Sequence, residues 1–314
     1  MKYRVFIDGA EGTTGLKIHE YFKRRDDIEL VNIEESKRKN LEARAAMIKE
    51  ADISFLCLPD KAAREISDVL SPEDRLIDTS SAHRTAPGWV YGMPELCKNQ
   101  RELIKKSRRV AVPGCHASGA ILIIKPLIAL GIIDEDYPFA ITSLTGYSGG
   151  GKKMIKEYEE GETTPHLQSP RQYGITQEHK HLPEIKKMTG MHKNPAFIPV
   201  VGSYYSGMEV IISLDTANLR WKGWAEEPTE AVKKIYREYY GKEELVKVVD
   251  KIDDNGFISA NRAAGNNGME ICVNGSLENI VLTASYDNLG KGASGAAIQN
   301  MNIMLGIDER KGLL

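Results

Sequence analysis

The N-terminal stretch of the chain constrains the fold more than any other part of the sequence. The stretch Tyr3–Asp8 predicts a buried strand, and a glycine turn, GAEGTTG, follows it directly. From Thr13 to Arg25 apolar residues recur at helical spacing, so a helix is expected to begin where the turn ends. Glycines let the backbone approach a pyrophosphate held at a helix N-terminus, whereas the alternative is a plain tight turn. We therefore expect a Rossmann-type dinucleotide site with these contacts: Gly9, Gly12, Thr13, Thr14 and Gly15.

The charged run that follows the next predicted strand bears on the choice of dinucleotide. The strand Ile28–Ile33 ends in EESKRK, roughly 20 residues after the glycines, where the adenosine ribose is expected. An acidic residue there selects NAD, whereas a hydroxyl followed by cations accepts a 2′-phosphate. Both signals are present, and a solvated charge run is the alternative. We favour NADP (NADPH) held by Ser36, Lys37 and Arg38, with Glu34 or Glu35 pointing into solvent.

Strands and helices continue to alternate as far as residue 80. Predicted helices over 41–51 and 61–70 separate predicted strands over 53–59 and 75–80, which indicates a parallel, doubly wound sheet. Ligands of such sheets bind beyond the carboxyl ends of the strands. The segment Asp78–Arg84, at the carboxyl end of the last of these strands, therefore places Ser80 near the cofactor. Arg84 can clamp a phosphate or carboxylate of the substrate there, unless it is an ordinary surface arginine.

The segment VPGCHASGA carries the candidate nucleophile. A Pro-Gly turn ends a predicted strand over 109–112, and an apolar helix follows, so Cys115 falls in the first helical turn. Free backbone N–H groups and the helix dipole favour a thiolate at that position. The alternative is a small buried hydrophobic residue. The four cysteines show no CxxC spacing, which argues against a disulfide framework and a zinc ribbon.

Two motifs after Cys115 supply polar groups. The run SGGGKK predicts a flexible loop in which Lys152 and Lys153 meet an anionic substrate and Gly149 contacts the cofactor, and a solvated hairpin turn is the equal alternative. The run EHKHLPEI has three interpretations: a metal site of His179, His181 and Glu184, a surface histidine pair, or an acid/base partner for Cys115 oriented by Glu184. No further metal-ligand cluster stands out, so we expect no metal, and the residues do not decide which histidine acts.

The C-terminal half has a different pattern of elements. Strands are predicted over 197–203, 208–215, 245–249, 269–274 and 279–287 with one helix, 227–240, which indicates an α+β domain with an antiparallel or mixed sheet. A glycine-rich stretch then leads into a helix over 297–305 that is expected to return to the first domain, with Asn288 and Gly292 near the nicotinamide. The expected domains are 1–114 with 292–314 for NADP binding and 115–291 for catalysis and dimerisation.

Composition excludes several classes of protein. The formal net charge is −2 over 314 residues, so the chain lacks the basic field that nucleic acid or an anionic membrane surface requires. No apolar run resembles a signal peptide or reaches the roughly 18 residues of a membrane span. We expect a cytoplasmic enzyme with no nucleic-acid or membrane partner.

The chain as a whole resembles the N-acetyl-γ-glutamyl-phosphate reductase family, in its short form. The resemblance covers nearly all of the sequence. His116 departs from the aromatic residue that several members carry after the cysteine, and Val112 replaces the asparagine that many have before Pro-Gly. The motifs that carry the resemblance are Gly9–Gly15, Tyr91–Leu96, Pro113–Cys115, Ser148–Lys153, His179–Glu184 and Asp287–Gly295.

The resemblance implies a reaction in which Cys115 attacks an acyl phosphate and expels inorganic phosphate. Hydride from NADPH reduces the thioester to a thiohemiacetal, which collapses to N-acetylglutamate semialdehyde in arginine biosynthesis. His179 or His181 exchanges the proton, with Glu184 as the orienting group, and the family implies a homodimer or homotetramer.

Three other functions compete with this one. An aspartate-semialdehyde dehydrogenase-like enzyme shares the architecture and the nucleophile, but the His179-x-His181-x-x-Glu184 motif favours the acetylglutamyl reaction. A non-catalytic NADP sensor would tolerate loss of Cys115. A zinc hydrolase built on the histidine pair would contain stoichiometric metal.

Overall fold

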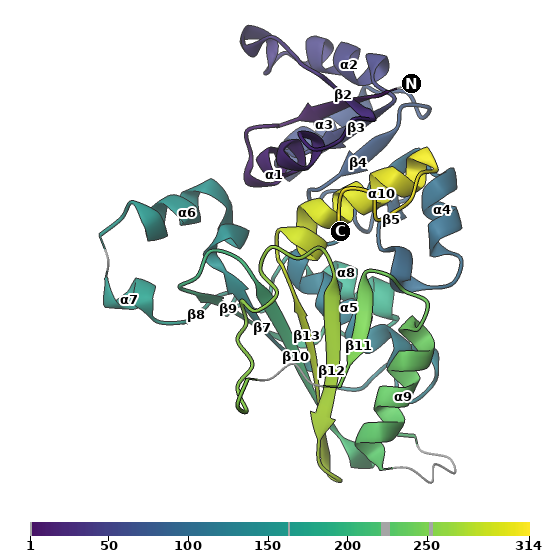
Figure 1. The fold of residues 1–314 in the computed structure, drawn as a ribbon, viewed down its shortest axis with the longest axis vertical. Coiled ribbons are helices and arrows are strands. Elements are labelled where there is room, and N and C mark those ends of the chain that lie inside the picture. The colour runs from purple at the N-terminus through teal and green to yellow at the C-terminus, as the bar shows by residue number, and fades with distance from the viewer. Residues whose placement is uncertain (1, 163, 221–226, 251–253) are drawn as a thin grey trace. The chain divides into compact units, whose positions relative to one another are not determined.

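The computed structural model describes residues 2–162, 164–220, 227–250 and 254–314 (Figure 1). The chain divides into two compact units. The first unit comprises Met1–Gly114 and Ala293–Leu314, and the second unit comprises Cys115–Gly292. Each unit is built around its own sheet, so each is described separately below.

The first unit contains a parallel sheet of six strands in the order β2-β1-β3-β4-β6-β5. Helices α2 and α3 pack on one face, where Ala45, Ile48 and Ile66 meet Phe6 and Leu56. This arrangement confirms the predicted doubly wound sheet. The strands are β1 (Tyr3–Asp8), β2 (Ile28–Val31), β3 (Ile53–Leu56), β4 (Leu76–Asp78), β5 (Val90–Tyr91) and β6 (Arg109–Ala111). The helices are α1 (Thr13–Phe22), α2 (Leu41–Glu50), α3 (Asp60–Asp68), α4 (Gln100–Lys106) and α10 (Gly295–Leu305).

The opposite face of this sheet is covered by α1 and by the C-terminal helix α10. Phe22 of α1 packs on Phe55 of β3, with ring centroids 5.9 Å apart. Asn300 of α10 donates a hydrogen bond of 2.8 Å to the carbonyl of Gly92. A Cβ on Gly92 would lie 2.8 Å from that amide, so only glycine permits the contact. The predicted return of the last helix to the first unit is therefore confirmed.

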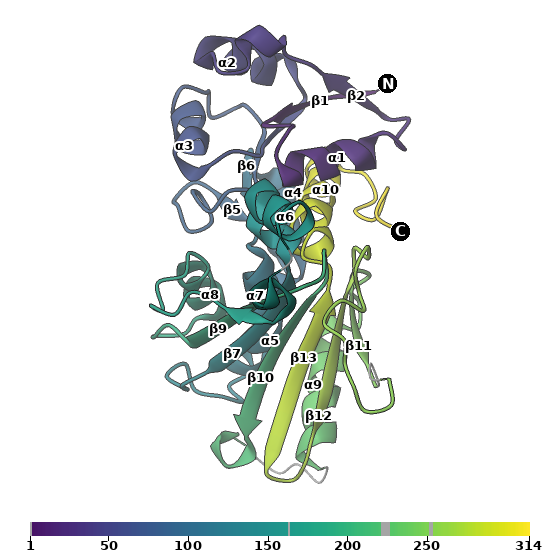
Figure 2. The same ribbon diagram turned by 90° about the vertical axis from the view of Figure 1, so that its left-hand side faces the viewer.

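The second unit contains a mixed sheet of seven strands in the order β11-β12-β13-β10-β7-β9-β8. β7 with β9 and β11 with β12 pair in parallel, and the other neighbours are antiparallel. Figure 2 shows the long strands β10, β12 and β13 side by side. The strands are β7 (Ala140–Gly146), β8 (Arg171–Gln172), β9 (Ala196–Gly202), β10 (Met208–Asp215), β11 (Val246–Val249), β12 (Met269–Gly275) and β13 (Asn279–Tyr286).

The central helix of the second unit is α5 (Cys115–Ala129), which is almost entirely buried. Pro126 lies inside α5 and has no N–H for the carbonyl of Leu122, four residues earlier. The hydroxyl of Tyr240 donates to that carbonyl at 2.6 Å, and the hydroxyl of Tyr236 donates to the next one, of Ile123. Helix α9 (Pro228–Tyr240) thereby satisfies the acceptor that Pro126 leaves open. The remaining helices of this unit are α6 (Gly151–Glu159), α7 (Pro165–Gln168) and α8 (Leu182–Thr189).

The predicted flexible loop at Ser148–Lys153 is wrong. A 3₁₀ turn, Tyr147–Gly150, leads directly into α6, so both lysines lie in the first turn of a helix. Gly151 begins this helix with a φ of 71°, a conformation that glycine adopts without strain. The three glycines favour the prediction of a loop. The helix is indicated instead by the helical spacing of the apolar residues Met154, Ile155 and Tyr158.

No helix within the described ranges is long and apolar enough to span a membrane.

Candidate active site

The glycines of the turn after β1 differ in how closely other atoms of the protein surround them. Gly9 has a φ of 85°, and a Cβ there would lie 2.3 Å from the carbonyl oxygen of Cys57. A Cβ on Gly15 would lie 2.5 Å from the carbonyl oxygen of Gly9. Gly12 differs, because the nearest atom to its Cβ would be 3.4 Å away, an ordinary contact. The protein's own packing therefore demands glycine at positions 9 and 15, and leaves the space at position 12 open to a ligand.

The first turn of α1 offers donors without competition from the chain. Its N-cap residue, Gly12, forms no side-chain cap, and no acidic residue lies in the first turn. Thr13 Oγ1 is buried and has no hydrogen-bond partner among the described residues. The carbonyl of Thr14 accepts a hydrogen bond of 3.3 Å from Ser294, just before α10. An uncapped helix start and a buried hydroxyl that has no partner among the described residues fit the pyrophosphate of a dinucleotide.

The charged residues after β2 lie beside the glycine turn. Ser36 and Lys37 belong to an exposed 3₁₀ turn, Glu35–Lys37, and Lys37 pairs with Glu34 at 3.0 Å. Arg38 forms an ion pair with Glu11 of the glycine turn and a second one, at 3.5 Å, with Glu35. The pair with Glu11 brings the Arg38 guanidinium to the edge of the dinucleotide turn. A bound 2′-phosphate would replace these exposed carboxylates as the partner of the Arg38 guanidinium and would bind it more strongly.

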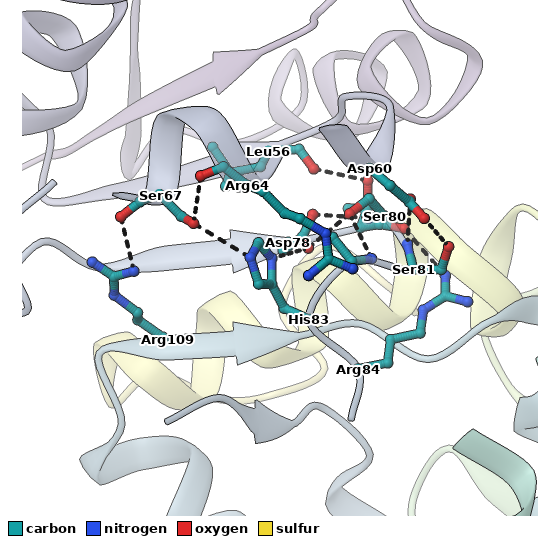
Figure 3. Close-up of polar contacts among 12 residues, drawn as sticks. Leu56, Asp60, Arg64, Ser67, Asp78, Ser80, Ser81, His83, Arg84 and Arg109 are labelled. Carbon is teal, nitrogen blue, oxygen red and sulfur yellow. Dashed lines mark hydrogen bonds and ion pairs between the residues drawn. The ribbon is translucent and has the colours of Figure 1, made fainter. Parts of the chain in front are cut away.

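Figure 3 shows how the loop after β4 is held. The buried carboxylate of Asp78 accepts from the backbone N–H of Ser80 at 2.9 Å, from the Ser80 hydroxyl at 2.8 Å, and pairs with Nδ1 of His83 at 2.7 Å. The hydroxyl of Ser81 donates to Asp60 at 2.6 Å. His83 also stacks on Trp89, with ring centroids 4.1 Å apart. The hydroxyl of Ser80 therefore binds Asp78 within the loop and stabilises the conformation of the loop.

The guanidinium of Arg84 is directed into the protein. Nε donates to the carbonyl of Val112 at 2.9 Å, and Nη2 donates to the carbonyl of Thr79 at 3.2 Å. Arg84 is only 8% exposed. These bonds join the loops that follow β4 and β6, so the geometry gives Arg84 a structural role. The sequence predicted a bidentate clamp on the substrate, but Nε and Nη2 bind backbone carbonyls instead.

In the second unit, α5 begins at Cys115, and its first turn is anchored by Tyr286. The Tyr286 hydroxyl donates to the carbonyl of Cys115 at 2.6 Å and accepts from the N–H of Gly119 at 3.1 Å. Gly292 packs against the nucleophile, since a Cβ there would lie 3.0 Å from Cβ of Cys115. Cys115 itself is half-buried. The thiol is thus held at the start of a fixed helix.

His116 occupies a buried polar position next to Cys115. Its Nδ1 lies 2.7 Å from Oγ of Ser143 on β7, and its Nε2 lies 2.6 Å from the phenolic oxygen of Tyr173. Burial lowers the pKa of His116 to about 3, with smaller contributions from the charges of His179 and Lys180. Burial also raises the pKa of Tyr173, and the charge of Cys115 adds to that shift. Both rings are therefore neutral at pH 7.

His179 and His181 join His116 in a cluster of three imidazoles. Ring centroids are 5.6 Å apart for His116 and His179, 5.4 Å for His116 and His181, and 4.6 Å for His179 and His181. The backbone N–H of His181 donates to Nδ1 of His179 at 3.2 Å, which leaves the proton of a neutral His179 on Nε2. His181 and Glu184, at the start of α8, are 4% and 1% exposed.

The group of ligand atoms that includes the thiol contains one of the two candidate histidines. One ring nitrogen of His181 lies within 4.8 Å of Sγ of Cys115, in a group that also includes His116 but not His179. The metal set of His179, His181 and Glu184, one of the three interpretations of the sequence, is not the group of ligand atoms that the described residues bring together.

The remaining predicted residues lie around the turn before α6. Asn288 is buried, donates to Oγ of Ser148 at 3.0 Å and accepts from the N–H of Gly207 at 2.9 Å. A Cβ on Gly149 would lie 3.6 Å from Nδ2 of Asn288. Lys152 and Lys153 are exposed, and neither forms an ion pair with any described residue. Two free cations at a helix start form a suitable surface for an anion.

Sequence reasoning missed several polar partners in both units. The buried Asp8 at the end of β1 is held by Arg44, whose Nη2 lies 2.7 Å from its Oδ2; burial raises the pKa of Asp8 and Arg44 opposes that rise. Tyr173, Ser143 and Tyr286 also belong to the site. No local motif marks them, because each is joined to its partner through the tertiary fold.

Two family models match the chain. "Semialdehyde dehydrogenase, NAD binding domain" matches residues 4–106, and "Semialdehyde dehydrogenase, dimerisation domain" matches residues 115–288. Together they cover parts of both units.

Curated relatives match over nearly their full length. The N-acetyl-gamma-glutamyl-phosphate reductase of Trichormus variabilis is 42% identical over 99% of this chain and 99% of its own. The protein of the same name from Brucella ovis is 41% identical over 98% of this chain and 100% of its own.

Solved structures with the same fold include two aspartate semialdehyde dehydrogenases. The Vibrio cholerae enzyme II, complexed with ASA, has a TM-score of 0.68 at 16% identity over 98% of this chain and 99% of its own. The Candida albicans enzyme with NADP has a TM-score of 0.65 at 15% identity over 97% of this chain and 99% of its own. At these identities the likeness concerns the fold alone.

Proposed function

The chain belongs to the semialdehyde dehydrogenase family, and from that premise we propose that it reduces N-acetyl-γ-glutamyl phosphate to N-acetylglutamate 5-semialdehyde with NADPH, in arginine biosynthesis. Membership makes the chain an oxidoreductase with a nicotinamide cofactor. The names of relatives that are 41–42% identical over nearly the whole chain support this substrate. The observation that carries the chemistry is the Cys115 thiol at the first turn of α5, with a His181 ring nitrogen within 4.8 Å.

The proposed reaction begins with Cys115. Its thiolate attacks the acyl carbon, the bond from that carbon to the phosphate oxygen breaks, and inorganic phosphate leaves with the bonding electrons. The product of this step is a thioester on Cys115. Reduction of the thioester gives a thiohemiacetal, whose carbon–sulfur bond then breaks to release the aldehyde and regenerate the thiolate.

His181 is the better candidate for the acid/base group. It protonates the oxyanion of the reduced adduct and takes the proton back from the hydroxyl when the carbon–sulfur bond breaks. Its proximity to Sγ of Cys115 supports this role, and Glu184, buried three residues later, supports an orienting role. His179 is not part of the group of ligand atoms that contains Sγ of Cys115, and its Nδ1 accepts a hydrogen bond from the backbone N–H of His181. We assign it to positioning, together with Tyr173.

Backbone groups of α5 supply the proposed oxyanion site. The first N–H groups of a helix have no acceptor four residues earlier, so they face outward with the positive end of the dipole. Tyr286 fixes this turn through Cys115 and Gly119. Lys152 and Lys153, at the start of α6, are the candidate cations for the substrate's phosphate or carboxylate.

The first unit holds the proposed cofactor site. When bound, the reduced nicotinamide supplies the hydride. The open space at Gly12, the unpartnered hydroxyl of Thr13 and the uncapped N-terminus of α1 fit its pyrophosphate. Arg38, tied to the glycine turn through Glu11, supports NADP over NAD, with Ser36 and Lys37 beside it. The Candida albicans enzyme of the same fold was solved with NADP.

The proposed assembly is a homodimer or homotetramer, since residues 115–288 match the family's dimerisation domain. The four cysteines are free thiols, which suits the reducing setting of the cytoplasm and keeps Cys115 available.

The test is phosphate-dependent reduction of NADP⁺ by N-acetylglutamate semialdehyde. We expect activity in the intact protein, near-complete loss in Cys115→Ser, and a clear preference for this semialdehyde over aspartate semialdehyde. A preference for the aspartate compound would replace the proposed substrate. Tight NADP binding with no turnover of either compound would favour the alternative that the protein is a non-catalytic NADP sensor.

A further inference from the structure

Cys115, His116 and His181 bring three metal-ligand atoms together in the second unit. Sγ of Cys115 and one ring nitrogen of each histidine all lie within 4.8 Å of one another. Both histidines are buried, and Cys115 is half-buried. A thiolate with two imidazoles is a ligand set that zinc prefers, and three protein ligands leave the fourth tetrahedral position open.

We propose that Cys115, His116 and His181 form a binding site for a thiophilic divalent cation such as Zn²⁺ or Co²⁺, and that an ion bound there removes the thiolate from reaction. The binding site is independent of the proposed function. Only the second consequence, inhibition of the reductase, rests on it.

The arrangement lies close to the geometry that zinc requires. Bonds of about 2.0–2.3 Å in a tetrahedral site separate the ligand atoms by about 3.3–3.8 Å. Atoms already within 4.8 Å of one another therefore need to close by roughly 1 Å. The two imidazole rings belong to different elements, since His116 lies in α5 and His181 immediately precedes α8, so each approaches the thiol from its own direction.

Ser143 supplies the outer contact that a metal-bound histidine ordinarily has. Such a histidine donates its second ring N–H to an oxygen, which fixes its orientation. Nδ1 of His116 lies 2.7 Å from Oγ of Ser143, a buried side chain on β7. This bond assigns Nε2 of His116 as the ligand atom.

Tyr173 then competes with the metal. Its phenolic oxygen lies 2.6 Å from Nε2 of His116, so a cation reaches that nitrogen only by displacing the hydroxyl. Removal of the hydroxyl is expected to tighten metal binding. Metal binding at scattered surface histidines has no reason to respond to Tyr173, so this variant separates the proposed site from incidental binding.

The experiment is a Co²⁺ titration of the reduced full-length protein without substrate or NADP. We expect one equivalent per chain, with thiolate-to-cobalt charge-transfer absorption and the d–d bands of a tetrahedral site. The charge-transfer band is expected to vanish in Cys115→Ser. The affinity is expected to fall at least tenfold in His116→Phe and His181→Phe, and to rise at least threefold in Tyr173→Phe.

Matched controls lie outside the cluster. Cys97→Ser removes an exposed thiol, and His192→Gln removes an exposed histidine that pairs with Asp136 at 3.3 Å. Both are expected to titrate like the intact protein. Zn²⁺ is also expected to slow alkylation of Cys115 by iodoacetamide, read by mass spectrometry, and EDTA is expected to restore the rate.

Absence of the charge-transfer band in the intact protein, or an unchanged titration in Cys115→Ser, would overturn the proposal. Cobalt binding without reductase activity would contradict the proposed function but support the metal site. Reductase activity without cobalt binding would support the proposed function and contradict the metal site.

Discussion

Nε2 of His116 and the phenolic oxygen of Tyr173 lie 2.6 Å apart, although 57 positions separate the two residues in the sequence. Nδ1 of the same imidazole meets Ser143 at 2.7 Å. A neutral imidazole has one donor and one acceptor, so one of these hydroxyls donates to the ring and the other accepts from it. The residue that follows Cys115 thereby links the start of α5 to β7 and to the segment that leads to His179.

This link predicts a loss of stability in His116→Phe. The substitution leaves the hydroxyl of Ser143, which is 0% exposed, without its ring partner. An unpaired buried polar group costs about 1–3 kcal/mol, measured as a decrease in the free energy of unfolding in urea. An unchanged free energy would show that the two hydrogen bonds contribute nothing net.

The same variant is expected to change how the free energy of unfolding depends on pH. The pKa of His116 is about 3 in the folded protein against an ordinary value of 6.5, so the unfolded chain binds the proton first as the pH falls. Stability from this group is full above pH 6.5 and is lost progressively towards pH 3. His116→Phe is expected to flatten that part of the stability profile, and the exposed histidine variant His192→Gln is the control.

Gly12→Ala is expected to weaken NADPH binding at least tenfold with little change in thermal stability. Its Cβ would meet no protein atom closer than 3.4 Å but would enter the space assigned to the pyrophosphate. Gly15→Ala is the contrasting variant, because its Cβ would lie 2.5 Å from the carbonyl of Gly9 and must disturb the turn itself. Fluorescence titration with NADPH and thermal melts separate the two effects. Parent-like affinity in Gly12→Ala would contradict the proposed cofactor position.

Arg84→Ala is expected to lower stability by about 1.5–3 kcal/mol, since the carbonyls of Thr79 and Val112 lose a charged donor. The KM for the acyl phosphate is expected to stay within about twofold of the parent in the folded fraction, because these bonds are structural. A tenfold rise in KM without destabilisation would restore the substrate clamp that the sequence predicted.

Lys152→Ala with Lys153→Ala is expected to raise the KM for the acyl phosphate about tenfold while leaving the melting temperature unchanged, because neither exposed lysine supports the fold. Lys156→Ala, one turn further along α6, removes an exposed pair with Glu160 and serves as the matched control. Equal KM values in all three proteins would remove the assigned substrate contact.

Glu209→Gln is expected to stabilise the protein at neutral pH. Burial raises the pKa of Glu209 to about 7 from an ordinary 4.5, so the unfolded chain ionises first as the pH rises. The stability this carboxyl provides is full below pH 4.5 and is lost as the pH rises through 7. The difference in melting temperature between Glu209→Gln and the parent should therefore widen across this range. Glu238→Gln, on the exposed face of α9, should show no such widening.

The sequence by itself determined the elements whose signals are local. The stretch Tyr3–Asp8 forms β1 at the predicted residues, and Cys115 begins α5 directly after the Pro-Gly turn, as predicted. Periodicity and turn residues act over a few positions, so they can be read without the fold. The same local reading failed at Ser148–Lys153, where three glycines hid the start of α6.

Only the tertiary structure decided which polar groups meet. Arg84 turned inward to the carbonyls of Thr79 and Val112, and His116 found Ser143 and Tyr173. The physical reason is that a buried donor or acceptor must find a partner wherever the packed chain supplies one. That partner is set by strand register and helix packing across tens of residues, which no local pattern of residues records.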